Sequence, residues 1–405
     1  MLRFNSVSIC ILVVAFGTLV VRSANADDKA DVFDAVRKNN LKQLNALIEK
    51  GASVVEVNPV GWQPIHLASR AGNTALVRRL LDAGAAVDVA QKSPETGDDL
   101  GPRLDYDSED FLVSLLQPGD LPLHCAARSG SVETVQLLID SGAKVDAPSR
   151  SGYAPIYSAV KANKLNVVRA LLKAGADPSK PFACDYLCCG ISTEKGQLTH
   201  VAAMGGHLKT LQTLIEAGSP LASTYERIEG GTGPGQRPID LAVVEGHVEI
   251  AKFLLNRDGA DMKTELYPKT LLTGLLCTAV QVDHLSMAKL LLDAGADVNG
   301  TISFQPIAED PAENWQPIHF VARDHDNAEM VKLLLKAGAS PTATLSSGKQ
   351  PLHLAALIER PNVISELLAA GASPTAKDNK GQTPIDIARK RMRTEALKLL
   401  TAEDK

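Results

Sequence analysis

The sequence contains few aromatic residues and, beyond its first 26 residues, no long apolar segment. Phe, Trp and Tyr together make up 4% of the 405 residues, although hydrophobic residues make up 45%. This composition, rich in Ala, Leu and Val, favours helices over a β-rich fold. The net charge of −5 gives no indication of binding to nucleic acid or to an anionic membrane.

One apolar run, at the N-terminus, has the properties of a targeting segment. Arg3 precedes a 15-residue apolar run at 7–21, and the tripeptide Ala-Asn-Ala follows at 24–26. These three features are typical of a cleavable secretory signal, whereas a membrane-spanning helix needs about 20 apolar residues. We therefore expect residues 1–26 to be a signal peptide. The mature chain, periplasmic or secreted, is then expected to begin near Asp27 without a membrane span. An uncleaved N-terminal anchor is the alternative.

A short motif recurs along the remainder of the chain. Trp62-Gln-Pro-Ile-His66 is repeated identically as Trp315-Gln-Pro-Ile-His319. The position of the histidine, here called h, recurs ten times, with a shortest spacing of 33 residues and longer gaps where residues are inserted. An apolar pair follows at h+14 and h+15, and a glycine follows near h+18 in nine of the ten units. The ten h positions are 33, 66, 124, 157, 200, 240, 277, 319, 353 and 386.

The residue pattern of each unit predicts a pair of helices. Proline opens the first helix, a turn follows near a glycine such as Gly72 or Gly130, and a later glycine ends a second, amphipathic helix. This arrangement resembles the ankyrin repeat family, whose T-P-L-H-x-A signature and 33-residue period match residues 31 to about 400. The resemblance implies one all-α solenoid of about ten ankyrin repeats, with several loop insertions, over residues 27–405. Because other residues replace the histidine in five units, we expect stability to vary along the stack. The replacements are Phe33, Tyr157, Asp240, Cys277 and Asp386.

The recurring histidine invites a catalytic interpretation, but the pattern argues against it. Catalysis needs unlike groups that converge at one point, whereas these histidines lie one to a repeat. The resemblance implies that each of them bonds to backbone near its own loop. The sequence contains no G-x-S-x-G, H-E-x-x-H or G-x-x-x-x-G-K-[ST] motif. We therefore expect a protein without enzymatic activity, catalytic residues, metal or cofactor.

Both tryptophans and one tyrosine are predicted to contact a partner. Trp62, Trp315 and Tyr153 all occupy position h−4, which the resemblance places on the exposed inner rim of the repeat. Exposed aromatic residues are frequent hot spots of protein interfaces. The alternative is that each ring covers a neighbouring loop.

A second candidate surface is formed by position h+4, which the resemblance directs toward the concave face. Six of the ten units carry a basic residue there, namely Arg37, Arg70, Arg128, Lys161, Arg323 and Lys390. Aromatic anchors beside basic residues suit an acidic protein segment, and a solvated basic face is the alternative. The leading hypothesis is an exported, monomeric scaffold that binds another protein through its concave face and hairpin loops, with no role in nucleic-acid binding.

The inserted loops carry the remaining candidate chemistry. Cys184, Cys188 and Cys189 cluster in one of them, and in an oxidising compartment Cys184 is predicted to form a disulfide with either neighbour. Zinc would need a further ligand, and no histidine is close in sequence. A metal- or redox-active protein centred on residues 181–190 is the rival hypothesis. The largest insertion, at about 89–119, begins with an acidic stretch, where a solvated loop is favoured over a calcium site.

Overall fold

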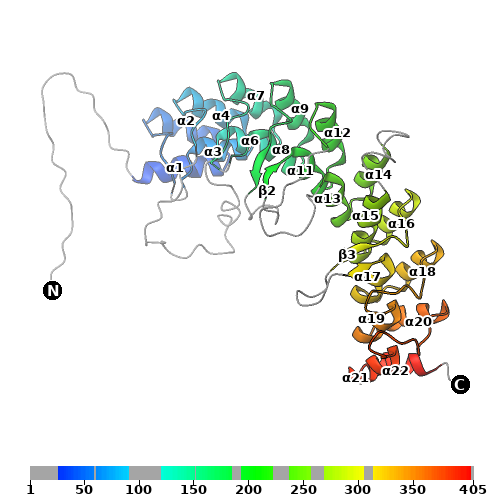
Figure 1. The fold of residues 1–405 in the computed structure, drawn as a ribbon. Coiled ribbons are helices and arrows are strands. Elements are labelled where there is room, and N and C mark those ends of the chain that lie inside the picture. The colour runs from blue at the N-terminus through cyan, green and yellow to red at the C-terminus, as the bar shows by residue number, and fades with distance from the viewer. Residues whose placement is uncertain are drawn as a thin grey trace, which may run out of the picture.

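The computed structural model describes residues 26–58, 61–90, 120–150, 152–184, 193–221, 237–256, 269–304 and 313–402. These residues form a two-layered stack of antiparallel helix pairs (Figure 1). The inner layer consists of α1 (Ala26–Arg37), α3 (Pro64–Arg70), α6 (Pro122–Ser129), α8 (Pro155–Lys161), α11 (Leu198–Met204), α13 (Pro238–Val244), α15 (Lys269–Gln281), α17 (Pro317–Asp324), α19 (Pro351–Ile358) and α21 (Pro384–Lys390). The outer layer consists of α2 (Leu41–Glu49), α4 (Thr74–Asp82), α7 (Val132–Asp140), α9 (Leu165–Lys173), α12 (Leu208–Glu216), α14 (Val248–Asn256), α16 (Leu285–Asp293), α18 (Ala328–Lys336), α20 (Pro361–Ala369) and α22 (Thr394–Thr401). This arrangement confirms the predicted all-α solenoid.

The helices begin and end where the sequence pattern places their signals. Most inner helices begin at proline, as α3 does at Pro64, because the N–H of the first helical residue has no partner within the helix. Several outer helices are capped by a side chain, as α4 is by Asn73, which accepts a hydrogen bond from the N–H of Leu76 (2.9 Å). Of the nine predicted terminal glycines, eight are described, and all eight have positive φ, such as 97° at Gly142. Gly259 lies outside the described residues.

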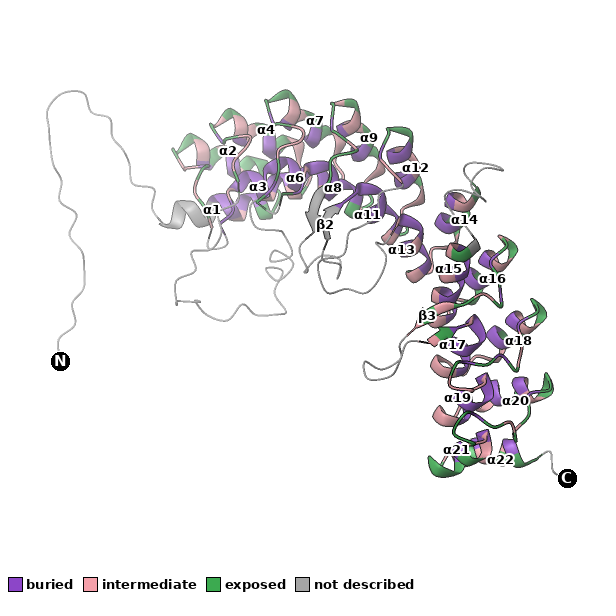
Figure 2. Ribbon diagram, in the orientation of Figure 1, coloured by how far each residue is buried: buried purple, intermediate pink, exposed green. Residues whose placement is uncertain are grey.

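The hydrophobic core runs along the stack between the two layers (Figure 2). The first member of the predicted apolar pair is fully buried in most units, as for Leu80, Leu138 and Leu171. The second member, such as Leu81 or Leu172, is partly buried and packs against the same core. Full burial of one leucine side chain stabilises the fold by roughly 1.5–3 kcal/mol. Because each repeat buries this surface only against its neighbours, the units are stable as a stack.

Two of the inserted loops contain short antiparallel hairpins. β1 (Phe182–Cys184) pairs with β2 (Thr193–Gly196), directly before α11. β3 (Ile302–Phe304) pairs with β4 (Glu313–Trp315), directly before α17. Both hairpins therefore extend the loops that lead into inner helices.

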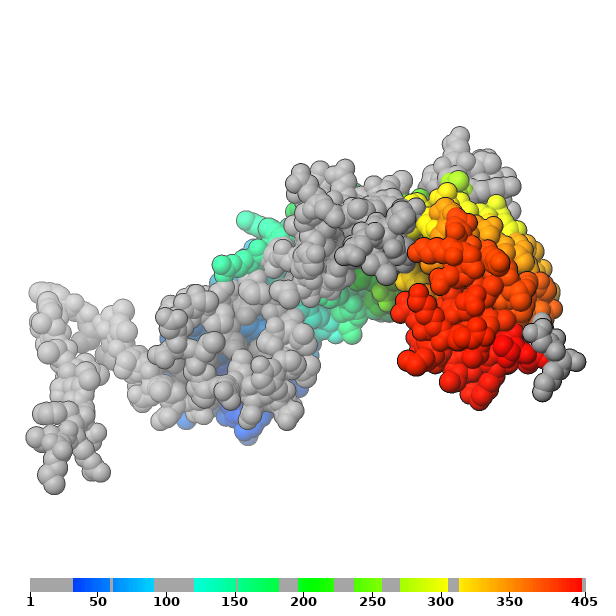
Figure 3. All heavy atoms as spheres, turned by 60° about the horizontal axis from the view of Figure 1, so that its bottom comes forward, coloured from blue at the N-terminus to red at the C-terminus, as the bar shows by residue number. Residues whose placement is uncertain are grey.

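The stack bends between α12 and α14, so that the inner helices line the inside of the bend (Figure 1). Successive inner helices contact each other along the described stack, whereas α12 and α14 contact each other less than any other two successive outer helices. At the bend, the outer helices α12 and α14 therefore move apart, whereas the inner helices stay in contact. The result is an elongated, bent body, also seen in the space-filling view (Figure 3). No helix within the described ranges combines the length and the apolar composition needed to cross a bilayer.

Candidate functional site

Four of the five histidines at position h hold the inner helices in place. His66 accepts a hydrogen bond at Nδ1 from the backbone N–H of Gln63 (3.2 Å), the residue before its helix. Its Nε2–H donates to the carbonyl of Val89 (2.9 Å) in the following loop. The same two kinds of bond are made by His124, His319 and His353. Each ring thus closes the start of its own helix and ties it to the next loop, which confirms the predicted structural role.

Burial lowers the pKa of these histidines, because removal from water disfavours the charged imidazolium. This cause is the largest one for His66, His124, His319 and His353. A neutral ring also fits the bonding pattern, in which one ring nitrogen accepts and the other donates. At Asp240 a carboxylate replaces the imidazole and accepts the equivalent bond from the N–H of Arg237 (2.6 Å). The departure from histidine therefore keeps the helix cap in this unit.

A second polar ladder joins neighbouring repeats at position h+7, where the outer helix begins, and it was not predicted from the sequence. His247 donates from Nε2 to the carbonyl of Met204 (2.9 Å), and His284 donates to the carbonyl of Val244 (3.0 Å). His325, at h+6 of its unit, bonds to the preceding repeat in the same way. Each accepting carbonyl belongs to position h+4 of the preceding inner helix. The ladder therefore fixes the backbone beneath the predicted concave side chains.

The residue type in this ladder changes along the stack. Asn73 and Ser131 in the N-terminal units cap their own outer helices. Near the C-terminus, Arg360 donates to the carbonyl of Arg323 (3.3 Å), and Arg393 makes the corresponding bond in the last unit. The histidines lie between these two sets and span the bend. The sequence signal that identifies this ladder is the recurrence of histidine at h+7 in three successive units, as His207, His247 and His284.

The three aromatic residues at h−4 are buried, so the prediction that they are exposed is wrong. Trp62 and Tyr153 are each 1% exposed and Trp315 is 2% exposed. A tight turn directs Trp62 inward: its N–H donates to the side chain of Asn58, its carbonyl accepts from the N–H of Asn58, and Gly61 between them has a φ of 79°. These rings belong to the core. Almost none of their surface is exposed to a partner in this structure.

Positions h−4, h and h+4 form one row of contacting side chains, not two separate surfaces. The guanidinium of Arg70 lies 5.7 Å from the centre of the Trp62 ring, which lies 6.3 Å from that of His66. In the eighth unit, Arg323 lies 5.5 Å from the centre of the Trp315 ring in the same way. Positions h and h+4 lie one above the other on the inner helix, whereas the ring at h−4 comes from the loop or strand just before that helix.

Arg323, one of the predicted concave residues, is partly buried among aromatic and acidic side chains. Its guanidinium lies 4.9 Å from the centre of the Phe304 ring, in addition to Trp315, and 3.0 Å from the carboxylate of Asp324. Burial raises the pKa of Asp324, while the charge of Arg323 acts in the opposite direction. Arg323 therefore stabilises the C-terminal part of the stack through contacts within the chain.

The first four repeats present a run of cations, here called the basic track, which consists of Arg37 (α1), Arg70 (α3), Arg128 (α6) and Lys161 (α8). Arg37 and Lys161 are exposed, and Arg70 and Arg128 are partly buried. Inner helices bury their opposite face against the outer layer, so these side chains lie on the concave surface. Arg128 forms an ion pair of 2.8 Å with Asp120, which is buried at h−4 of the same unit. The track thus combines four cations with one buried carboxylate.

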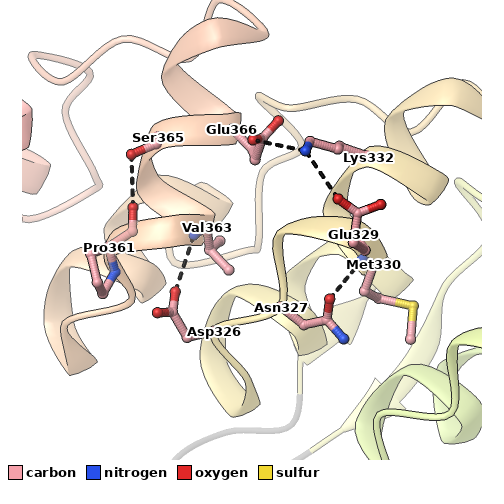
Figure 4. Close-up of polar contacts among 9 residues, drawn as sticks. All are labelled: Asp326, Asn327, Glu329, Met330, Lys332, Pro361, Val363, Ser365 and Glu366. Atoms are coloured by element: carbon pink, nitrogen blue, oxygen red, sulfur yellow. Dashed lines mark hydrogen bonds and ion pairs between the residues drawn. The ribbon is translucent and has the colours of Figure 1, made fainter.

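Charges on the convex side join one repeat to the next. Figure 4 shows Lys332 between Glu329 on its own helix (3.0 Å) and Glu366 on α20 (3.6 Å). The hydrogen bond to Glu329 raises the pKa of Lys332. The carboxylate of Asp326 accepts a bond from the N–H of Val363 (3.1 Å) at the start of α20. These ion pairs and this hydrogen bond stabilise the packing of the α18 repeat against the α20 repeat.

The predicted disulfide is not tested by the structure. Cys184 is the last residue of β1, and Cys188 and Cys189 lie outside the described residues. Elsewhere, Cys125 and Cys277 are buried, and burial raises the pKa of each thiol to about 12. Both thiols therefore stay protonated and unreactive near neutral pH.

Three further sequence features fall largely outside the described part of the chain. They are the predicted signal, of which residues 1–25 are not described, the segment 91–119 of the largest insertion, and the segment 185–192 of the cysteine-containing loop. Within the described ranges, no group of three His, Cys, Asp or Glu side chains has the arrangement of a metal site.

Comparison with known proteins identifies the repeat unit. The profile for ankyrin repeats in three copies matches residues 105–182 and 318–405, and the profile for ankyrin repeats in many copies matches residues 200–255. The profile for a single ankyrin repeat matches residues 60–92 and 273–301. The chain belongs to the ankyrin repeat family. Ankyrin repeats generally mediate protein–protein interaction, and the fold is typically a scaffold without enzymatic activity.

Individual relatives share only part of their length with this ankyrin repeat chain. Ankyrin repeat and SOCS box protein 3 of Bos taurus is 29% identical over 124 residues, which are 31% of this chain and 19% of that protein. Human ankyrin repeat domain-containing protein 37 is 31% identical over 110 residues, which are 27% of this chain and 54% of that protein. Both shares are below two thirds of the relative. The crystal structure of the human ASB11 ankyrin repeat domain aligns with 63% of this chain and 100% of its own, at 24% identity and a TM-score of 0.46.

Proposed function

We propose that this protein is an exported, monomeric interaction scaffold that binds an acidic segment of another protein on the concave surface of its first four repeats. The observation that carries the proposal is the basic track, in which four successive inner helices each place one cation at h+4. A carboxylate-rich segment that lies across these helices meets one positive charge in every repeat. Charge complementarity of this kind selects partners and speeds their association.

Two members of the basic track already influence each other. Burial is the main cause that lowers the pKa of Arg70, and the positive charge of Arg128 on the next inner helix lowers it too. A partner carboxylate between the two guanidinium groups relieves this repulsion. Exposed ion pairs contribute on the order of 0.2–1 kcal/mol each, so the four contacts together supply roughly 1–4 kcal/mol. Because the charges are close to solvent, added salt weakens this sum.

Asp120 already makes, within the chain, the kind of contact that the proposal assigns to the partner. Its carboxylate lies 2.8 Å from Arg128 and is 2% exposed. A partner carboxylate therefore shares Arg128 with Asp120 and gains less there than from a cation that it contacts alone. Arg37 and Lys161, both exposed, are the positions at which charge reversal tests the proposal with least damage to the fold.

Charge reversal on opposite faces of the first four repeats is the decisive experiment. Arg37→Glu combined with Lys161→Glu alters the concave surface, and Arg78→Glu combined with Arg169→Glu alters exposed positions of the outer helices α4 and α9. Both pairs change the net charge equally. With a fluorescent glutamate-rich peptide as probe, we expect the concave pair to weaken binding at least about tenfold and the convex pair less than about threefold. Equal weakening by both pairs shows that binding follows net charge and refutes the concave site, as does a wild-type protein that does not bind the peptide.

Export rests on the N-terminal sequence. Arg3, the apolar run at 7–21 and the Ala-Asn-Ala tripeptide at 24–26 support it. Intact mass spectrometry of the protein from the periplasmic or secreted fraction of its native host is expected to show a mature chain that begins at Asp27. A full-length chain that sediments with membranes supports the uncleaved anchor instead, and a cytosolic chain contradicts export.

A further inference from the structure

The spacing of the basic track specifies the shape of the segment that fits it. Packed helices lie about 8–10 Å apart, and α1, α3, α6 and α8 contact each other in this order. Each contributes one cation at the same position of its repeat. The concave surface therefore offers one positive charge about every 8–10 Å along four repeats.

Backbone geometry determines which extended segment matches this spacing. In a β-strand, residues two apart share a face and lie about 6.6 Å apart, and residues four apart lie about 13 Å apart. In a polyproline II helix, every third residue returns to the same face after about 9.3 Å. Of these two conformations, only polyproline II presents side chains on one face at the spacing of the repeats.

An α-helical partner fits the basic track less well. Same-face residues seven apart lie about 10.5 Å apart, and the helix is about 10–12 Å wide. Arg70 and Arg128 are partly buried, one beside the Trp62 ring and the other beside Asp120. A narrow extended chain reaches both guanidinium groups, whereas a wide helix contacts chiefly the exposed cations.

We infer that the partner segment is a polyproline II stretch with a carboxylate at every third residue, four times in succession, lying across α1, α3, α6 and α8. This inference rests on the proposed function and specifies its ligand. Proline at the intervening positions preforms the conformation, and a preformed ligand loses less conformational entropy on binding. The acidic residues therefore set recognition, and the residues between them set rigidity.

In the next two repeats, position h+4 on the concave surface is apolar instead of basic. Met204 of α11 and Val244 of α13 occupy h+4 and are partly buried. Their carbonyls are held by His247 and His284 of the following repeats, so the apolar positions continue the register of the basic track. The complete segment has four acidic positions and then two apolar positions at the same interval, read in one chain direction or the other.

Three glutamate-containing peptides of equal length test the three-residue period. One carries glutamate at every third position with proline and glycine between, and a second carries the same residues with glutamate at every second position. A third, alanine-rich peptide carries glutamate at every seventh position of a helix. We expect the first to bind the full mature chain at least about tenfold more tightly than the other two in fluorescence anisotropy. The Arg37→Glu, Lys161→Glu variant is expected to lose this preference, and the Arg78→Glu, Arg169→Glu variant to keep it.

The outcomes separate this inference from the proposed function. If the acidic peptides bind equally and the concave variant still weakens all of them, the concave acidic site stands and the three-residue period is wrong. Tighter binding of the helical peptide also refutes the period. If no acidic peptide binds, both are wrong. The first peptide is then extended by two apolar residues at the same three-residue interval. Serine in place of these two residues is expected to weaken binding to the wild type and not to Met204→Gln, and an equal effect on both refutes the apolar extension.

Discussion

Replacement of Trp315 by alanine is expected to destabilise the C-terminal part of the stack. The side chain is 2% exposed, and its ring centre lies 5.2 Å from those of both Phe304 and Phe320. Truncation of a buried tryptophan typically costs about 3–5 kcal/mol. Among the described residues, the buried Nε1–H of Trp315 has no hydrogen-bond partner, and removal of an unsatisfied donor offsets part of this loss. We therefore expect a loss of unfolding free energy toward the lower end of this range.

The two tryptophans of the chain make the assay specific to one part of the stack. In the Trp315→Ala variant, tryptophan fluorescence reports only Trp62, near the N-terminus, whereas far-UV circular dichroism reports all helices. Urea titration is expected to remove part of the helical signal before the Trp62 signal changes, because each repeat depends chiefly on its neighbours. In Trp62→Ala the order is reversed, so that the fluorescence of Trp315 changes last.

An exposed apolar residue provides the matched control. Met392 is 84% exposed, and Met392→Ala is expected to change the free energy of unfolding by no more than about 0.5 kcal/mol. If Trp315→Ala has an effect as small as that of Met392→Ala, the ring is not part of the core. The prediction that the aromatic residues at position h−4 contact a partner would then stand.

Acidification is expected to lower the urea midpoint, because His66 and its equivalents are buried with a lowered pKa while the unfolded chain binds protons near the ordinary value of 6.5. Their contribution is complete above that pH and is lost as the pH falls toward the folded-state pKa; a midpoint that is constant between about pH 7 and pH 5 contradicts this. Asp120→Asn is expected to destabilise the fold by roughly 1–3 kcal/mol yet to strengthen acidic-peptide binding several-fold, since Arg128 loses its competitor; weaker binding refutes the competition. His284→Ala removes the bond to the carbonyl of Val244 at a cost of roughly 1–3 kcal/mol, with faster hydrogen exchange in α13 and α16; unchanged exchange shows that the ladder does not join these repeats.

Most of the fold was predictable from the sequence because the recurring residues of the repeat each meet a local requirement of the backbone. Pro64 marks a helix start, since its missing N–H has no role there. Gly84 marks a helix end, since its φ of 95° is costly for other residues. His66 indicates where its helix begins and where the following loop passes, because its ring forms one hydrogen bond to Gln63 and one to Val89. Such requirements depend on near neighbours in sequence, so the pattern alone places the helix pairs.

Exposure at h−4 was not predictable from the position in the repeat, because the preceding loop decides it. The turn at Asn58 and Gly61 directs Trp62 inward, whereas the pairing of Ile302 with Trp315 in a hairpin encloses the other ring. The two loops differ in length and reach the same result by different bonds. A cation four residues after the histidine, as at Arg70, was the available sign that the aromatic ring has a partner within its own repeat.

Photo-crosslinking from two positions of one repeat tests the concave binding site most directly. Lys161 ends the inner helix α8, and Arg169 lies exposed on the outer helix α9 of the same unit. A photoreactive residue is placed at either position, and the peptide with glutamate at every third position is added. The concave site predicts cross-links from position 161 and none above background from position 169. Equal yields from both positions, or cross-links from 169 alone, contradict it.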